Sequence, residues 1–186
     1  MQLEAQDYLR LVESNKSIVV LDTESFGFNA DFGTLICGSV KQVNGDTDTY
    51  HIEQLGNDRK VARELKERLE DADAWVTFYG KGHDIPFINT RLLRHGLKPV
   101  GLRPHIDMYY QLKYKLKMAS KSQAAFASWL DLPEKKMSVS ADTWASMGAN
   151  FDKNLKVIIK RCESDVATLD QLYQRCKHLI RDIKRG

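Results

Sequence analysis

Two carboxylates near the start of the chain have the type and spacing of a metal site. Asp22 and Glu24 follow the apolar run Ile18 to Leu21, which is typical of a short buried strand. Because side chains two positions apart on a strand point to the same side, both acids are expected to project together from its end. Two adjacent anions repel each other, and a divalent cation that binds both relieves the repulsion. The pair alone is weak evidence, since an acidic turn after a strand is also common.

Two further acids lie in segments that could approach this pair. Asp84 follows a strand-like segment and a double-glycine turn, and Asp165 lies within a long helical segment near the end of the chain. Each has a structural alternative: Asp84, two residues before Pro86, is a good helix N-cap, and an acid on a helix is usually exposed. The apolar neighbours Val166 and Leu169 instead place Asp165 beside the buried stripe of its helix.

The elements that must position these acids are predicted from hydrophobic spacing and turn residues. Besides the strand before Asp22, strands are expected at 35–42, 49–53, 74–79 and 103–108. Asn44-Gly45 predicts a tight hairpin turn between the first two of these. Helices are expected at 3–12, 58–69, 86–95, 124–130, 141–147 and 155–183. Three consecutive strands followed by alternating helices and strands indicate one α/β domain over residues 1–186, with a mixed central sheet of about five strands flanked by helices.

The composition indicates an ordinary soluble globular protein, because 42% of the 186 residues are hydrophobic and 28% are charged. The longest apolar run is strand-sized and the first residues are polar, so neither a membrane span nor a secretory signal is expected. Cys37, Cys162 and Cys176 lack a CxxC spacing, which argues against a disulfide framework and a zinc site. We therefore expect a cytoplasmic protein with reduced, buried thiols.

Positive charge is concentrated in a few segments although the net charge is only +3. One segment interleaves lysines with tyrosines: Lys113, Lys115, Lys117 and Lys121 with Tyr109, Tyr110 and Tyr114. Aromatic rings and cations together suit a single-stranded nucleic acid, so Lys113 and Lys115 are expected to contact such a substrate. The alternative is that the lysines form a solvated face and the tyrosines belong to the core.

Taken in order, the acidic segments resemble the RNase H-like 3′–5′ exonucleases of the DEDD group, which includes DNA polymerase proofreading domains. The resemblance extends from Val19 to about Tyr173. It rests mainly on Leu21-Asp-Thr-Glu24, Gly80-Lys-Gly-His-Asp-Ile-Pro-Phe87 and Cys162-Glu-Ser-Asp-Val166. Between the last two, His105-Ile-Asp-Met-Tyr109 resembles the family's strand-ending segment.

The resemblance implies an RNase H-like fold and a two-metal site for Mg²⁺ or Mn²⁺ formed by Asp22, Glu24, Asp84 and Asp165. Two such ions can activate a water and neutralise charge on the entering and leaving oxygens of a phosphodiester. The implied activity is 3′–5′ exonucleolytic hydrolysis of single-stranded nucleic acid, DNA more than RNA. Residues beside the acids are then expected to contact the substrate, namely Thr23, Tyr79 and His83.

Arg161 is the main departure from the family pattern. Members of the family have a tyrosine four residues before the final Asp, or a histidine five before it, where this chain has Arg161 and Lys160. Neither is a general base at neutral pH, since arginine stays protonated and lysine titrates at about 10. Arg161 could instead stabilise charge on the transition-state phosphate. The alternatives are a catalytically impaired nucleic-acid-binding module of the same fold, and a metal-independent protein-interaction domain in which the four acids coincide by chance.

Overall fold

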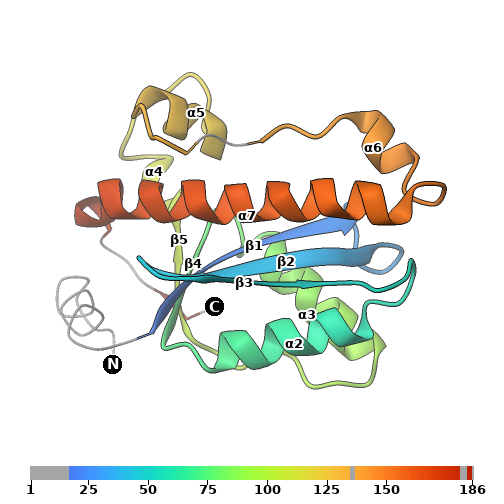
Figure 1. The fold of residues 1–186 in the computed structure, drawn as a ribbon. Coiled ribbons are helices and arrows are strands. Elements are labelled where there is room, and N and C mark those ends of the chain that lie inside the picture. Colours follow the sequence, from blue (N-terminus) through green and yellow to red (C-terminus); the bar gives the residue numbers. More distant parts are fainter. Residues whose placement is uncertain (1–16, 135–136, 181–183, 186) are drawn as a thin grey trace.

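One mixed sheet forms the centre of the computed structural model, which describes residues 17–134, 137–180 and 184–185 (Figure 1). Its strands are β1 (Ile18–Phe26), β2 (Thr34–Gln42), β3 (Thr47–His51), β4 (Ala74–Thr77), β5 (Pro104–Asp107) and β6 (Lys184–Arg185). Their order in the sheet is β3-β2-β1-β4-β5-β6. The strand β1 pairs antiparallel with β2 and parallel with β4, so the predicted mixed sheet is confirmed, with the two-residue β6 as an additional strand.

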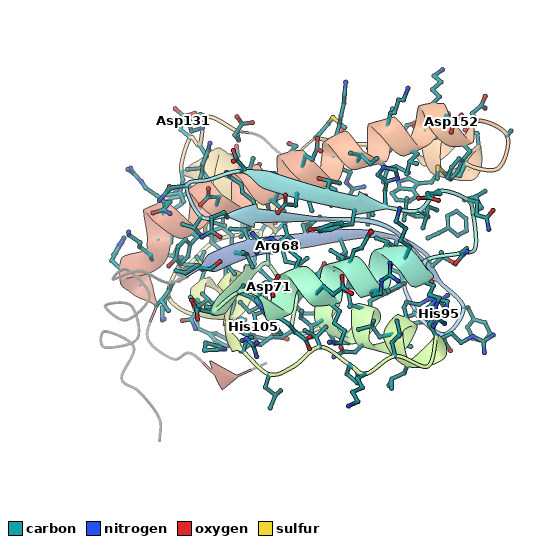
Figure 2. All side chains as sticks on the ribbon, turned by 60° about the horizontal axis from the view of Figure 1, so that its bottom comes forward. Arg68, Asp71, His95, His105, Asp131 and Asp152 are labelled. Carbon is teal, nitrogen blue, oxygen red and sulfur yellow. The ribbon has the colours of Figure 1, made fainter. Side chains whose placement is uncertain are left out.

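Helices cover both faces of this sheet. They are α2 (Arg59–Glu70), α3 (Asp84–Arg94), α4 (Met108–Leu112), α5 (Gln123–Trp129), α6 (Ala141–Ala145) and α7 (Phe151–Cys176), with a 3₁₀ turn at Lys177–Leu179. The long helix α7 crosses one face, and α2 and α3 lie against the other (Figures 1 and 2). The sheet with helices on both sides is the architecture that the sequence predicts.

Alternation along β1 decides which of its side chains meet which helix. Val19 belongs to the same buried cluster as Leu65 of α2, whereas Val20 belongs to a cluster with Val166 and Leu169 of α7. Because successive side chains on a strand point to opposite faces, Asp22 and Glu24 continue the face of Val20 and point toward α7. The residue between them, Thr23, points to the side of α2 and α3.

The strand β1 is longer than predicted, and the two acids lie within it rather than after it. Its pairing with β2 continues as far as Phe26 opposite Thr34, with an irregularity between Glu24 and Ser25. Its pairing with β4 covers only Ile18 to Val20, because β4 ends at Thr77. Beyond Val20 the β4 edge of β1 is therefore no longer covered by β4, and this leaves space for side chains from other elements.

Other elements differ from the predictions mainly at their ends. The strand expected at 74–79 stops at Thr77 because Tyr79 takes a left-handed backbone conformation, with φ of 65°. The helix α4 was not predicted; it begins after Asp107, whose side chain accepts a hydrogen bond from the Tyr109 amide. The last long helix spans 151–176 instead of 155–183. The helix expected at 3–12 and residues 181–183 lie outside the described residues.

A buried ion-pair network holds α2, α3 and β2 together on the face opposite α7. The Asp58 carboxylate accepts hydrogen bonds from the Leu35 amide at 2.9 Å and from Arg91 Nε at 2.7 Å, and it lies 2.6 Å from His95 Nε2. His95 marks the end of α3 in Figure 2. Burial opposes ionisation of Asp58, but these partners outweigh it and lower the pKa of its carboxyl group. The network fixes the start of α2 against α3.

Two further sequence predictions concern the membrane and the thiols. Among the described residues, none of the helices has the length and apolar character needed to cross a bilayer. Cys37, Cys162 and Cys176 are buried and form no disulfide, as expected.

Candidate metal centre

Three acids meet where α7 crosses β1. Asp22, Glu24 and Asp165 each offer a carboxylate oxygen, and these three atoms lie within 4.8 Å of one another. Glu24 and Asp165 are buried and Asp22 is partly exposed. Asp22 and Asp165 are 143 positions apart in the sequence. They meet because the face of β1 that carries Asp22 and Glu24 points toward α7.

Asp84 lies on the other side of β1 and is held by Thr23. Its Oδ1 accepts hydrogen bonds from the Thr23 amide at 3.0 Å and from the Thr23 hydroxyl at 2.6 Å. Asp84 is the first residue of α3 and His83 is the N-cap, so the alternative interpretation of Asp84 as the N-cap is wrong. Burial raises the pKa of the Asp84 carboxyl group, and the Thr23 hydrogen bond and the neighbouring His83 act in the opposite direction.

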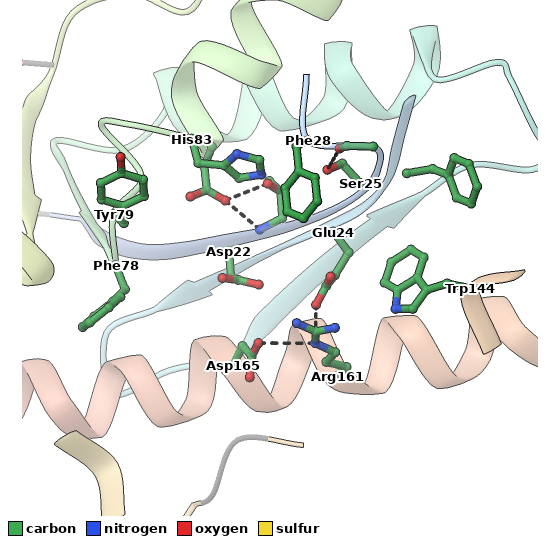
Figure 3. Close-up of a pocket in the computed structure, with 14 residues that line it drawn as sticks. Asp22, Glu24, Ser25, Phe28, Phe78, Tyr79, His83, Trp144, Arg161 and Asp165 are labelled. Carbon is green, nitrogen blue, oxygen red and sulfur yellow. Dashed lines mark hydrogen bonds and ion pairs between the residues drawn. The ribbon is translucent and has the colours of Figure 1, made fainter. Parts of the chain in front are cut away.

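Figure 3 shows Asp22, Glu24 and Asp165 directed into one pocket, which Asp84 also lines. The volume of this pocket is about 520 Å³. The remaining lining residues are Thr23, Ser25, Phe26, Gly27, Phe28, Phe78, Tyr79, His83, Trp144 and Arg161. A pocket with polar groups at its base and aromatic rings around it can hold a small organic group such as a nucleotide.

Arg161 lies inside the acidic cluster. Its Nε is 2.8 Å from Glu24 Oε1 and 3.8 Å from Asp165 Oδ2. Residues four apart on a helix share a face, so α7 presents Arg161 and Asp165 together to β1. The neighbouring Lys160, in contrast, is exposed to solvent. The permanently charged guanidinium therefore offsets part of the negative charge of the cluster.

The acids fit a divalent cation. Carboxylate oxygens are hard ligands that Mg²⁺ and Mn²⁺ prefer, and three of them converge here within reach of one ion. Crowding several carboxylates in a buried position is unfavourable unless cations balance them, and Arg161 carries a single charge. Asp84 shares the pocket with these three acids and could complete the ligand set.

A thiol supports the strand beneath Asp22. Cys162 Sγ donates to the backbone oxygen of Asp22 at 3.3 Å and lies 3.8 Å from its Oδ2. Burial, together with the nearby Cys37 and Asp22, raises the pKa of the Cys162 thiol well above its usual value. The group therefore stays protonated and acts as a donor that packs α7 onto β1.

Tyrosines and a lysine extend from the pocket along its Tyr79 side. Tyr79 stacks on Tyr110 with ring centroids 5.9 Å apart, and both contact Tyr109 edge to face. Lys113 Nζ lies over the rings of Tyr109, Tyr110 and Tyr114, at 5.3, 4.4 and 4.7 Å from their centroids. We call Tyr79, Tyr109, Tyr110, Tyr114 and Lys113 the tyrosine platform. Tyr79, Tyr110 and Tyr114 are exposed, so this part of the chain presents rings to solvent.

Other residues proposed to contact the substrate have different surroundings. Lys115 Nζ contacts the Leu179 backbone oxygen at 2.5 Å and Gln111 Oε1 at 3.0 Å, away from the platform. The Thr23 hydroxyl is engaged by Asp84. His83 lines the pocket, with its ring 5.6 Å from that of Phe87.

Asp107 is a residue that the sequence predictions missed as part of the site. Its buried carboxylate accepts hydrogen bonds from the amides of Tyr79 at 2.8 Å, Lys81 at 2.9 Å and Tyr109 at 3.1 Å. It thus fixes the turn after β4 and the start of α4, and with them the platform. Its position at the end of a strand, in the segment His105-Ile-Asp-Met-Tyr109 that resembles the family pattern, is the signal that could have found it. The pocket aromatics Phe28 and Trp144 carry no comparable signal.

Comparisons with known proteins agree with this architecture. A family model of the RNase H superfamily matches residues 19–177, and the chain belongs to this superfamily. This confirms the RNase H-like fold expected from the acidic segments.

A similar solved structure is the family B DNA polymerase from the hyperthermophilic archaeon Pyrobaculum calidifontis. It superposes with a TM-score of 0.71 over 88% of this chain and 25% of the polymerase, at 15% identity. This chain therefore spans about a quarter of the length of that polymerase. At this identity the likeness concerns the fold. The search of curated proteins found no match to this sequence.

Proposed function

We propose that this protein is a divalent-metal-dependent nuclease that removes nucleotides from the 3′ end of a single-stranded nucleic acid. The observation that carries the proposal is the convergence of four carboxylates in one pocket from three distant segments, β1, the start of α3, and α7. Membership of the RNase H superfamily supports nuclease chemistry, and the fold likeness to a DNA polymerase favours DNA over RNA.

In the complex with the substrate, Asp22, Glu24, Asp84 and Asp165 would hold two ions, Mg²⁺ or Mn²⁺. Bound in this pocket, the ions would supply an activated water and charge neutralisation at the reacting phosphate. The residues of the chain determine where the two ions would bind. Asp22 clusters with Glu24 and Asp165 and is followed by Thr23, which fixes the Asp84 carboxylate with two hydrogen bonds, so Asp22 is the natural shared ligand.

The pocket and the tyrosine platform support a single strand as substrate. Exposed rings of Tyr79 and Tyr110 offer stacking surfaces for unpaired bases, and Lys113 places a cation where a phosphate could approach. Tyr79 belongs to both the pocket and the platform, so a strand lying on the platform would lead its end toward the carboxylates.

A catalytically impaired nucleic-acid-binding module is the second candidate, and Arg161 is the observation that favours it. The residue replaces the tyrosine that a subgroup of the resembling exonucleases has at this position, and its charge is directed to Glu24. This candidate predicts binding of metal and nucleic acid without turnover.

The test is a gel assay with oligonucleotides labelled at the 3′ or the 5′ end, in Mg²⁺, Mn²⁺ or EDTA. We expect the 5′-labelled strand to shorten stepwise, the 3′ label to appear at once in mononucleotides, and EDTA to stop both. Immediate release of the 5′ label in mononucleotides with stepwise shortening of the 3′-labelled strand, or degradation in EDTA, would contradict the proposal. Binding without shortening in either metal would select the impaired module.

A further inference from the structure

Arg161 occupies a defined place among the acids of the candidate metal centre. Its Nε lies 2.8 Å from Glu24 Oε1, and the Asp165 carboxylate is within 4 Å on the same side (Figure 3). The side chain is about three-quarters buried, with 24% of its surface exposed. Because Arg161 and Asp165 are one turn apart on α7, this arrangement is part of the helix rather than a chance contact of a long surface side chain.

The charge of Arg161 competes with that of a metal ion. Glu24 and Asp165 are two of the three acids that could ligate one ion, and the guanidinium lies against both of them. A fixed cation at ion-pair distance from the ligands lowers the free energy of the negative cluster and repels a second incoming cation. The four carboxylates carry four negative charges, and Arg161 leaves a net charge of minus three for metal ions to balance.

We infer that Arg161 is a built-in cation of this site, so that the free protein binds one divalent ion where the four carboxylates alone would bind two. The inference rests on the proposed function, since it assumes that these acids are metal ligands. In this role Arg161 keeps Glu24 and Asp165 in place before metal binds. Its guanidinium, rather than a metal ion, then balances the negative charge beside Glu24.

The number of Mn²⁺ ions bound per chain tests the inference without relying on activity. Calorimetric titration of the wild type with Mn²⁺, in the absence of nucleic acid, should give one ion. Arg161→Gln removes the charge and should give two, or bind the first at least about tenfold more tightly. Arg161→Lys keeps a charge and should resemble the wild type. Lys160→Gln is the matched control, because it removes an exposed charge from the adjacent position and should change nothing.

Thermal unfolding in EDTA gives a second readout. Arg161→Gln should have a lower midpoint than the wild type and a larger increase on addition of Mn²⁺, whereas Lys160→Gln should match the wild type in both. If Arg161→Gln does not fold, Arg161→Met keeps an unbranched uncharged stem and repeats both measurements.

The outcomes separate the two proposals. Two ions in the wild type, one ion bound with equal affinity by the wild type and Arg161→Gln, or an equal effect of Lys160→Gln would overturn the role of Arg161 and leave the metal-dependent nuclease intact. Absence of Mn²⁺ binding in the wild type and in every Arg161 variant would overturn the proposed function itself.

Discussion

At the scale of single residues, the site depends on the alternation of side chains along β1. Asp22 and Glu24 point toward α7, and the intervening Thr23 points to the other side, where it binds Asp84. One short segment of strand thus contributes carboxylates on one side and a positioning hydrogen bond on the other. Because β1 contacts both α7 and the start of α3 in this way, acids that are far apart in sequence line the same pocket.

Thr23 should influence catalysis through Asp84 rather than through the substrate. Thr23→Val keeps the volume and the backbone donor but removes the hydroxyl hydrogen bond of 2.6 Å. We expect nuclease kcat/KM to fall about tenfold or more, and Mn²⁺ affinity to fall with it, as for other groups that orient metal ligands. Thr90→Val is the matched control, since the Thr90 hydroxyl on the exposed side of α3 donates to the Pro86 backbone oxygen. Wild-type kinetics in Thr23→Val would remove this role.

At the scale of elements, the sequence predicted best those helices and turns that depend on interactions between residues close together in the chain. The helix expected at 58–69 is α2 at 59–70, because its apolar stripe is a local pattern. The hairpin around Asn44-Gly45 is also local, but its connection from Gln42 to Thr47 is longer than the predicted two-residue turn, and Asn44 has a positive φ of 58° whereas Gly45 does not. Local patterns were thus sufficient for the order of the main helices and strands.

Features set by distant contacts could not be predicted in the same way. The hydrogen bonds from Thr23 to Asp84 connect residues 61 positions apart, and no local pattern indicates them. The ion pair between Arg161 and Glu24 joins α7 to β1 in the same manner. The sequence indicated the acids themselves, because each follows a recognisable segment, but not the partners that orient them.

The tyrosine platform leads to a prediction that separates two neighbouring lysines. Lys113→Ala should weaken binding to a single-stranded oligonucleotide and reduce the salt slope of the binding constant by up to about 0.7, the value for one phosphate contact. Lys115→Ala should change both much less, because Lys115 is directed to the Leu179 backbone oxygen. Fluorescence anisotropy from low to moderate salt, in EDTA so that no metal-dependent cleavage occurs, measures both. Equal effects of the two variants would mean that the platform does not bind the strand.

At the scale of the whole molecule, the buried polar groups set the response to pH. His105 lies on β5, with its Nε2 2.7 Å from the Thr77 hydroxyl and its ring edge to face with Trp75 (Figure 2 labels its position). Burial, and to a lesser extent the charge of Lys81, lowers the pKa of His105 to about 3. The folded protein therefore keeps this residue neutral over the range in which an unfolded histidine, with a pKa of about 6.5, becomes protonated.

The unfolded chain binds more protons than the folded one in this range, so stability falls as pH decreases below about 6.5. We expect the free energy of unfolding to decrease by about 1 kcal/mol between pH 7 and 5.5 because of His105 alone. Urea unfolding in EDTA at several pH values should show a smaller decrease for His105→Gln, which cannot titrate. The exposed His178→Gln is the control and should keep the wild-type slope. Identical slopes for wild type and His105→Gln would contradict the prediction.

The most direct test of the metal-dependent nuclease is the rate of 3′-end shortening by wild type and Asp22→Asn in Mn²⁺. Asp22 belongs to the cluster that it forms with Glu24 and Asp165, so its charge should be needed for metal binding and for the reaction. The predicted result is shortening by the wild type and a loss of at least about 100-fold in Asp22→Asn. The variant should keep a wild-type or slightly higher free energy of unfolding in EDTA, because removing one anion relieves repulsion. Asp152→Asn, an exposed acid at the start of α7, should retain full activity. Wild-type rates in a folded Asp22→Asn would contradict the metal-dependent mechanism.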